Sequence, residues 1–256
     1  MVADNPKVSV VMPAYNMERY IEIAIRSVQA QTYENWELLV IDDCSKDTTC
    51  EIVERMAAQD SRIRLIRNEQ NMGVSRTRNR GIDMSEGEYV AFLDSDDMWR
   101  PQKLKCQLEL LKQTDAEFSY CSYGIVDAVG NQARPPYRVP NHVTYQELLR
   151  ENVVGCSTVV ISSPVIKKYR FGSGFYHEDY VLWVKLLQDG LQAAGCVEVL
   201  ADWRYIENSR SFNKVQAAKN RWHIYREFLG LSFLKSVWLL TCYATAGLKK
   251  YMSRSK

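Results

Sequence analysis

The sequence lacks the cysteine and histidine patterns of a zinc protein or of a domain held together by disulfides. Its seven cysteines include no pair with C-x-x-C spacing, and none of them clusters with the three histidines. An odd number of thiols also leaves at least one without a partner in the chain. We therefore expect reduced cysteines, no zinc site and a cytoplasmic protein.

The sequence also lacks a large net charge and a long uninterrupted apolar run. The formal net charge is only +2, which gives no indication of a nucleic-acid partner. Residues 228–248 are largely apolar, but Lys235 divides them, and the remaining run is shorter than the roughly 20 residues that a membrane span needs. Residues 1–7 are polar and too short to form a signal peptide.

The C-terminal end carries cations without acids. No Asp or Glu follows Glu227, whereas Lys235, Lys249, Lys250, Arg254 and Lys256 do. We interpret residues 228–248 as an amphipathic helix that either packs on the domain or lies in a membrane interface. The basic end is either a solvated terminus or a peripheral contact with the anionic inner face of the cytoplasmic membrane.

The first half of the chain alternates short apolar runs with stretches of helical periodicity. We expect strands over residues 8–12, 37–41, 63–66 and 89–93, and helices over 19–30, 48–59 and 75–84. Strands alternating with helices of this length predict an α/β fold, with a mostly parallel sheet flanked by helices.

The second half is less regular. We expect helices over residues 101–114 and 178–188, and strands over 118–122, 157–161, 193–200 and 203–207. Residues 131–140 carry three prolines and are predicted to form a loop. We assign residues 1–212 to one catalytic domain and residues 213–256 to a C-terminal helical, basic segment.

Three of the predicted strands end in polar loops, at residues 13–16, 42–47 and 94–97. Open α/β sheets bind ligands beyond the carboxyl ends of their strands. Although these loops are far apart in the chain, we expect them to meet at one edge of the sheet.

The densest of these loops holds three carboxylates, Asp94, Asp96 and Asp97. Like charges this close repel one another, so a bound cation would compensate them. Carboxylate oxygens suit Mg²⁺ or Mn²⁺, which usually share them with phosphate groups. The alternative is an acidic turn that caps the next helix, since Asp is common in such turns.

Other polar groups can likewise be interpreted either as functional or as purely structural. Asp42 and Asp43 indicate either contacts to a nucleotide base or turn chemistry. Asn71 and Arg78 flank a predicted helix start, where backbone N–H groups and arginines hold phosphates, although a solvated helix face has the same composition. The pair of acids at 178–179 is either a helix cap or a general base, and paired carboxylates also occur in glycoside hydrolases.

Six segments together resemble a known family. They are VSVVMPAYN at residues 8–16, SVQAQTY at 27–33, DDCS at 42–45, NMG and RNRG at 71–73 and 78–81, DSDD at 94–97, and ED at 178–179. Their order and spacing closely resemble family 2 glycosyltransferases with the GT-A fold, over residues 7–187. Cys44 stands where the family often has Gly, and Thr77 where it often has Ala.

This resemblance implies a role for each matching residue. Asp96 would bind the divalent cation directly, Asp94 would hold the ribose or a metal-bound water, and Asp179 would be the catalytic base, with Glu178 beside it. The predicted contacts to the nucleotide sugar are Pro13, Ala14, Tyr15, Asn16, Asp42, Asp43, Asn71, Arg78, Asp94, Ser95, Asp97, Arg210 and Lys214. Of these, Arg210 and Lys214 belong to a basic loop that we expect to close over the diphosphate.

The resemblance therefore implies a metal-dependent inverting transfer from a nucleotide sugar, which we expect to be a UDP-sugar. The expected acceptor is a hydroxyl of a bacterial cell-surface glycan or of an undecaprenyl-diphosphate-linked oligosaccharide. Transfer to polyprenyl phosphate and non-catalytic binding of a nucleotide sugar are the alternatives. A nucleotidyltransferase is disfavoured because Pro-Ala-Tyr-Asn stands where a glycine-rich loop would follow the first strand.

Overall fold

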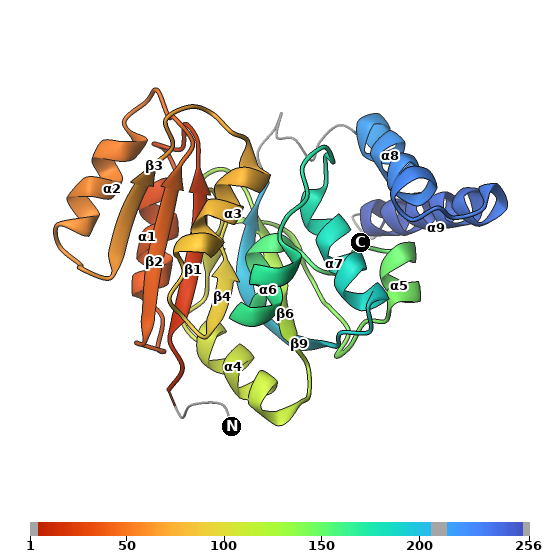
Figure 1. Ribbon diagram of the computed structural model, residues 1–256, viewed down its shortest axis with the longest axis horizontal. Helices are drawn as coiled ribbons and strands as arrows, with labels where there is room; N and C mark the ends of the chain where they lie inside the picture. Colours follow the sequence, from red (N-terminus) through yellow and green to blue (C-terminus); the bar gives the residue numbers. More distant parts are fainter. Residues whose placement is uncertain (1–4, 206–213, 253–256) are drawn as a thin grey trace.

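The computed structural model describes residues 5–205 and 214–252. Its centre is a nine-stranded sheet with helices on both faces, drawn in Figure 1. Along the main path the strand order is β3-β2-β1-β4-β8-β6-β9-β5, and β7 pairs with β6 beside this path. The expected α/β architecture is confirmed.

The first half of the chain follows the prediction closely. Strands β1 (Val8–Ala14), β2 (Trp36–Asp42), β3 (Ile63–Arg67) and β4 (Tyr89–Phe92) pair in parallel, joined by helices α1 (Ile21–Gln29), α2 (Thr49–Ala57) and α3 (Val74–Met84). All residues of β1 and β2 are buried, which explains their nearly continuous apolar character.

The second half makes the sheet mixed rather than mostly parallel. Strand β8 (Val160–Ser162) runs antiparallel to β4 and to β6 (Phe118–Val126), while β9 (Ala193–Arg204) runs parallel to β6. The short β5 (Met98–Trp99) pairs with the far end of β9. This pairing brings the C-terminal end of β9 beside the loop at 94–97.

Three local predictions were wrong. Residues 131–140 contain β7 (Gln132–Tyr137), because a strand that pairs on one side only can accommodate prolines. The strands expected at 193–200 and from 203 onward are one strand, β9, which ends at Arg204 and bends through irregular pairing with β6, while residues 206–207 of the prediction lie outside the described residues. Residues 156–158 form a 3₁₀ turn before β8 rather than the start of a strand.

Two hydrophobic cores cover the faces of the sheet. On one face, α3, α6 (Ser163–Tyr169) and α7 (Glu178–Gln188) contribute Ile82, Ile166 and Trp183. On the other face, α1, α2 and α4 (Lys103–Gln113) contribute side chains such as Ile25 and Leu108. Arg78 of α3 contacts Glu178 in the first turn of α7, so the acids of this turn lie close to the polar loops of the first half (Figure 1).

The C-terminal segment is helical, as expected. It comprises α8 (Lys214–His223), a π-helical turn (Ile224–Phe228) and α9 (Phe233–Met252), and α9 packs against α8 and α5 (Tyr145–Arg150). Leu239 of α9 is buried in the same core as Trp183 of α7, so one face of the helix packs on the domain. Within the two described ranges, no helix has both the length and the hydropathy that crossing a membrane requires.

Candidate active site

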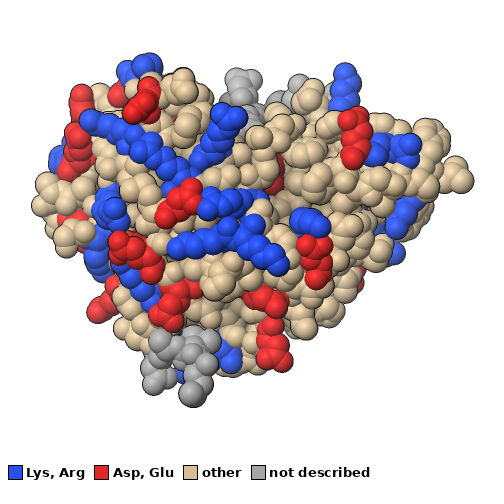
Figure 2. All heavy atoms as spheres, viewed as in Figure 1, with Lys and Arg blue, Asp and Glu red and all other residues tan. Residues whose placement is uncertain are grey.

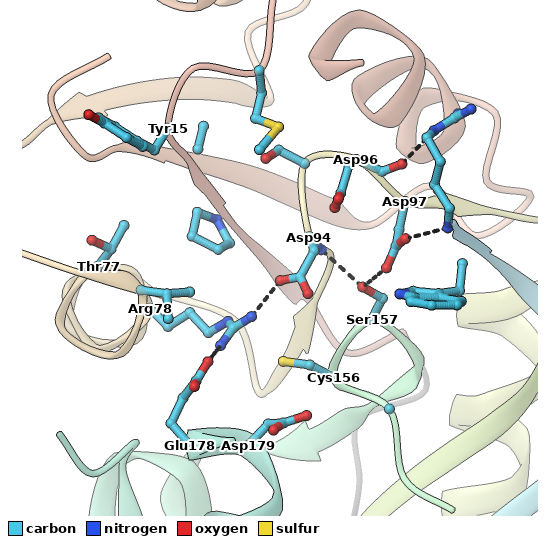
Figure 3. A pocket seen from close by; sticks show the side chains of 18 of the residues that line it. Tyr15, Thr77, Arg78, Asp94, Asp96, Asp97, Cys156, Ser157, Glu178 and Asp179 are labelled. Atoms are coloured by element: carbon cyan, nitrogen blue, oxygen red, sulfur yellow. Dashed lines mark hydrogen bonds and ion pairs between the residues drawn. The ribbon is translucent and has the colours of Figure 1, made fainter. Parts of the chain in front are cut away.

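A cavity of 810 Å³ opens where β1, β2 and β4 end, between α3 and the first turn of α7 (Figure 3). Its wall contains Pro13, Ala14, Tyr15, Met17, Asp43, Asn71, Gly73, Val74, Thr77, Arg78, Asp94, Ser95, Asp96, Asp97, Tyr123, Gly155, Cys156, Ser157, Thr158, Tyr176, His177, Glu178, Asp179, Ala201, Trp203 and Arg204. The polar strand ends of the first half and the acids of α7 therefore share one cavity.

The loops after β1 and β2 support each other behind the cavity wall. The register pairs Ala14 with Asp42, so both strands end at the same level. The backbone N–H of Lys46 donates to Asn16 Oδ1 (2.7 Å), and that of Asn16 donates to Ser45 Oγ (2.9 Å). Asn16 has a positive φ of 55°, which Asn tolerates better than most residues. Its observed contacts are to the neighbouring loop.

Asp43 lines the cavity but its carboxylate already accepts bonds from its own chain. The backbone N–H groups of Met72 and Gly73 donate to it (2.8 and 2.9 Å), and so does the Asn68 amide (2.8 Å). This fastens the loop before α3 to the end of β2. Asp42, which was predicted to contact the nucleotide sugar, is buried off the wall and accepts from the backbone N–H of Ser45 (3.1 Å), in keeping with the alternative of turn chemistry.

Arg78 is a buried bridge between the two sides of the cavity. Its side chain is only 4% exposed, and its guanidinium contacts Asp94 Oδ1 at 2.5 Å and Glu178 Oε1 at 2.6 Å. Burial opposes the charge of Arg78, but the carboxylates of Asp94 and Glu178 outweigh this and raise its pKa well above the ordinary value. The arginine thus joins the loop after β4 to the start of α7.

Two residues from elsewhere in the chain hold the 94–97 loop in place (Figure 3). The Ser157 hydroxyl donates to Asp97 Oδ2 (2.6 Å) and accepts from the backbone N–H of Asp94 (3.1 Å). The backbone N–H of Arg204 donates to Asp97 Oδ1 (2.9 Å), and the Arg204 guanidinium donates to the carbonyl of Asp96 (2.8 Å). Asp97 is therefore occupied with fixing the loop.

The carboxyl groups of this loop are costly to ionise together. Burial and the nearby Asp94 carboxylate raise the pKa of Asp96 to about 6. Burial and the charges of Asp96 and Asp94 raise the pKa of Asp97 well above its usual range. A cation beside Asp94 and Asp96 would relieve this repulsion, as the clustering of acids in the sequence suggests.

Asp179 and Glu178 diverge although they are adjacent. Glu178 turns towards Arg78, whereas the partly exposed Asp179 carboxylate lies on the cavity wall (Figure 3). Burial and the neighbouring Glu178 raise the pKa of Asp179 to about 6. A carboxylate with a pKa this close to neutrality is a better proton acceptor than an ordinary Asp.

The donor set suits a hard cation shared with a ligand. Within the described part of the chain, no three His, Cys, Asp or Glu side chains form a metal cage. Asp94 and Asp96 point into the cavity from one loop (Figure 3). One or two carboxylates completed by phosphate and water oxygens are a usual environment for Mg²⁺ or Mn²⁺. The residues therefore fit a diphosphate-bound metal rather than a site built from protein ligands alone.

The structure brings most predicted site residues to the cavity wall. Those on the wall are Pro13, Ala14, Tyr15, Asp43, Asn71, Arg78, Asp94, Ser95, Asp96, Asp97, Glu178 and Asp179. Asn16, which is exposed, and Asp42, which is buried, are not part of the wall. Arg210 lies outside the described residues, and of Lys214 only its place at the start of α8 is described. Closure of this loop over a diphosphate therefore stays a prediction.

Sequence reasoning missed the residues that support the 94–97 loop from behind. Ser157 lies in the strand predicted at 157–161 and Arg204 in the strand predicted at 203–207. Neither belongs to a cluster of polar residues. Only the pairing of β9 with β6 and β5 brings Arg204 to the loop. The wall residues Tyr176 and Trp203 were also not predicted as site residues, because isolated aromatics give no signal beyond that of core packing.

Comparison with known proteins decides the family. The sequence model of glycosyl transferase family 2 matches residues 9–170. This chain belongs to that family. The match includes the loops after β1, β2 and β4 and the helix that carries Arg78, and so confirms the resemblance on which the site was predicted.

Two curated relatives resemble the glycosyltransferase along nearly its whole length. The putative teichuronic acid biosynthesis glycosyltransferase TuaG of Bacillus subtilis is 37% identical over 96% of this chain and 97% of its own length. WfgD of Escherichia coli, named a UDP-Glc:alpha-D-GlcNAc-diphosphoundecaprenol beta-1,3-glucosyltransferase, is 36% identical over 97% of this chain and 96% of its own.

A solved structure confirms the fold of the glycosyltransferase. The S. aureus protein TarS, residues 1–349 in complex with UDP-GlcNAc, superimposes with a TM-score of 0.71 at 21% identity, covering 91% of this chain and 70% of TarS. At this level of identity the likeness shows a shared GT-A architecture and nothing finer.

Proposed function

We propose that the glycosyltransferase moves a sugar from a UDP-sugar to a hydroxyl group of a lipid-diphosphate-linked bacterial glycan, with inversion at the anomeric carbon. The observation that carries this proposal is Asp179. It is a carboxylate with a pKa raised to about 6, on the wall of the cavity that also holds the Asp94 and Asp96 side chains.

The donor half of the cavity suits a nucleoside diphosphate. Tyr15 and Ala14 offer apolar surface for a base, and Asn71 and Thr77 lie beside the N-terminal end of α3. UDP as the nucleotide is supported by WfgD, whose name specifies UDP-Glc, and by TarS, which was crystallised with UDP-GlcNAc. The identity of the sugar rests on the comparison with these proteins alone.

Asp96 would hold the proposed metal directly, with Asp94 beside it. When bound, Mn²⁺ or Mg²⁺ supplies positive charge to the diphosphate leaving group. Arg78 keeps Asp94 in place at 2.5 Å, and Arg204 anchors the backbone at Asp96. The chain therefore holds both proposed ligands in position before the donor arrives.

Asp179 is the proposed general base. The acceptor oxygen forms its bond to the anomeric carbon while the bond from that carbon to the diphosphate oxygen breaks, and the hydroxyl proton passes to the Asp179 carboxylate. In a single displacement of this kind, the acceptor oxygen attacks the anomeric carbon from the side opposite the leaving group, which inverts the configuration of that carbon. We do not assign this role to Glu178, because its carboxylate accepts from Arg78 at 2.6 Å.

A base in this position favours a hydroxyl acceptor over polyprenyl phosphate. A phosphate monoester is already largely ionised at neutral pH, because its second pKa is about 6, so its oxygen needs no base. A sugar hydroxyl does need one. The WfgD name, which specifies a sugar linked to diphosphoundecaprenol, supports the same class of acceptor.

The proposal is tested with purified protein, Mn²⁺, UDP-glucose or UDP-GlcNAc, and a synthetic GlcNAc-diphosphate-lipid. We expect UDP release that depends on the acceptor, a disaccharide product with the anomeric configuration opposite to that of the donor, and loss of activity in EDTA. Transfer only to lipid phosphate would support the alternative acceptor. Donor binding without any transfer would support a non-catalytic nucleotide-sugar-binding protein and contradict the proposal.

A further inference from the structure

The glycosyltransferase exposes a group of apolar side chains near its C-terminal end, which we call the α9 face. It consists of Phe228, Phe233, Leu234, Val237 and Trp238, with exposed fractions of 39%, 60%, 80%, 41% and 49%. Elsewhere in the described chain, the large apolar side chains that are exposed lie far apart in sequence. Clustered exposed apolar groups of this kind mark interaction surfaces, whereas single ones do not.

The α9 face is separate from the side of the helix that packs on the domain. Residues 233, 234, 237 and 238 are spaced so that they share one side of an α-helix. Ser236 and Leu239 point the other way and are fully buried. The helix therefore already has its core contact, and the exposed side chains are a second apolar surface.

Cationic side chains lie beside this surface. Lys235 and Arg226 are exposed, and the Arg150 guanidinium lies 5.1 Å from the centre of the Trp238 ring. Glu227, the last acid in the chain, sits beside His223 at 2.9 Å. Figure 2 shows several groups of Lys and Arg atoms and a group of Asp or Glu atoms among mostly uncharged atoms at the end of the molecule formed by α8 and α9. Apolar side chains with cations beside them suit a surface with anionic head groups over an apolar layer.

We infer that the α9 face binds the interface of an anionic lipid bilayer, with α9 lying on the membrane. Leu234 and Phe233 would enter the acyl boundary, Trp238 would lie at head-group level, and Lys235 and Arg226 would contact lipid phosphates. A second copy of the chain fits less well. A two-fold contact through this face would bring its cations near their own copies, and the exposed Glu227 is adjacent in the chain to only one of them, Arg226.

The α9 face is linked to the cavity by direct contacts. The Phe228 ring packs against Phe175 at 5.4 Å, and the backbone N–H of the next residue, Tyr176, donates to Asn220 Oδ1 of α8 (3.1 Å). Tyr176 and Asp179 both line the cavity. Binding of the α9 face would thus bring the base side of the cavity to the bilayer, where a lipid-linked acceptor resides; this consequence rests on the proposed function, whereas lipid binding does not.

The test is flotation of the full chain with vesicles, without donor, acceptor or metal. We compare phosphatidylcholine vesicles with vesicles that also contain phosphatidylglycerol. Leu234→Glu is matched by Val129→Glu, because these side chains are 80% and 79% exposed. We expect Leu234→Glu to lower partitioning into the anionic vesicles about tenfold or more, while Val129→Glu behaves as wild type. Lys235→Glu should weaken binding to anionic vesicles selectively.

Three results would overturn the inference. Equal flotation of Leu234→Glu and Val129→Glu would show that the α9 face is not the contact. Equal binding to both kinds of vesicle would remove the role of anionic lipid. A dimer in solution that Leu234→Glu dissociates, with no flotation of the wild type, would assign the face to a second copy. Because no reaction is measured, these results are independent of the proposed transferase activity.

Discussion

Arg78 and Glu178 are 100 positions apart in the chain, yet Nη1 of the arginine lies 2.6 Å from Oε1 of the glutamate. Both side chains are buried, with exposed fractions of 4% and 7%. The second arm of the guanidinium reaches Asp94 at 2.5 Å. This bridge fixes the distance between the loop proposed to hold the metal and the helix that carries the proposed base.

Removing one partner of the Arg78–Glu178 pair should lower the stability of the fold. In Glu178→Gln, the Arg78 guanidinium loses a charged partner without regaining water, so we expect a loss of about 3 kcal/mol in the free energy of unfolding. Urea unfolding measures it. Glu54→Gln is the matched control, because it breaks the Arg67–Glu54 pair at 2.8 Å on the exposed surface, and should cost less than about 1 kcal/mol. Equal losses in the two variants would contradict the structural role of Glu178.

The pH dependence of turnover should follow Asp179. Its pKa is raised to about 6, so the fraction of deprotonated base falls as the pH drops through 6. We expect kcat to decline below that pH, and Asp179→Asn to lower kcat by about 10²- to 10⁴-fold at pH 8 while donor affinity changes little. Initial rates and calorimetric titration with UDP-sugar measure the two effects. A wild-type profile that stays flat down to pH 4.5 would rule out this base.

The same substitution should stabilise the fold at neutral pH. Because the folded-state pKa of Asp179 lies above its unfolded value, its contribution to stability is fully present below about pH 4 and is lost as the pH rises through about 6. Asp179→Asn avoids the buried charge, so we expect it to be more stable than wild type at pH 8 by on the order of 1 kcal/mol, since the site is partly open to solvent. The difference should vanish near pH 4, as thermal melting across this range would show.

Metal affinity should depend most on Asp96. We expect Asp96→Asn to raise the Mn²⁺ concentration needed for half-maximal activity by roughly tenfold or more. Asp94→Asn should affect the metal less but lower stability, because it removes a partner of Arg78. Asp83→Asn, at an exposed carboxylate paired with Arg170, is the control. A larger metal effect from Asp94→Asn than from Asp96→Asn would reverse the proposed assignment.

A backbone prediction follows from Cys44. Its φ of 70° lies in the left-handed region, which explains why the family often has Gly there. Cys44→Gly should therefore raise the free energy of unfolding by up to about 1 kcal/mol. Cys106→Gly, in the middle of α4, should instead lower it by about 1 kcal/mol. Denaturant unfolding of both variants measures these changes in the free energy of unfolding. A destabilised Cys44→Gly would show that the side chain has another role.

The sequence predicted the first half of the fold well, because β1, β2 and β4 are mostly apolar and buried throughout, and α1 and α2 each have an apolar face of their own. It predicted the second half less well. There the strands are edges or bend, as in β7 and β9, and their pairing depends on contacts with distant segments. The spacing of apolar residues shows which side of a helix or strand is buried. It carries no information about which other helix or strand packs against that side.

The sequence alone determined the chemistry available to the glycosyltransferase: the acids at 94–97 and 178–179, the arginine at 78 and their places at strand and helix ends. Tertiary structure alone decided how these groups are used. It turned Glu178 to Arg78, tied Asp97 to Ser157, and left Asp179 on the cavity wall. The reason is physical, because a buried charge must be compensated by whichever partner the fold brings within contact, and that partner need not be near in the chain.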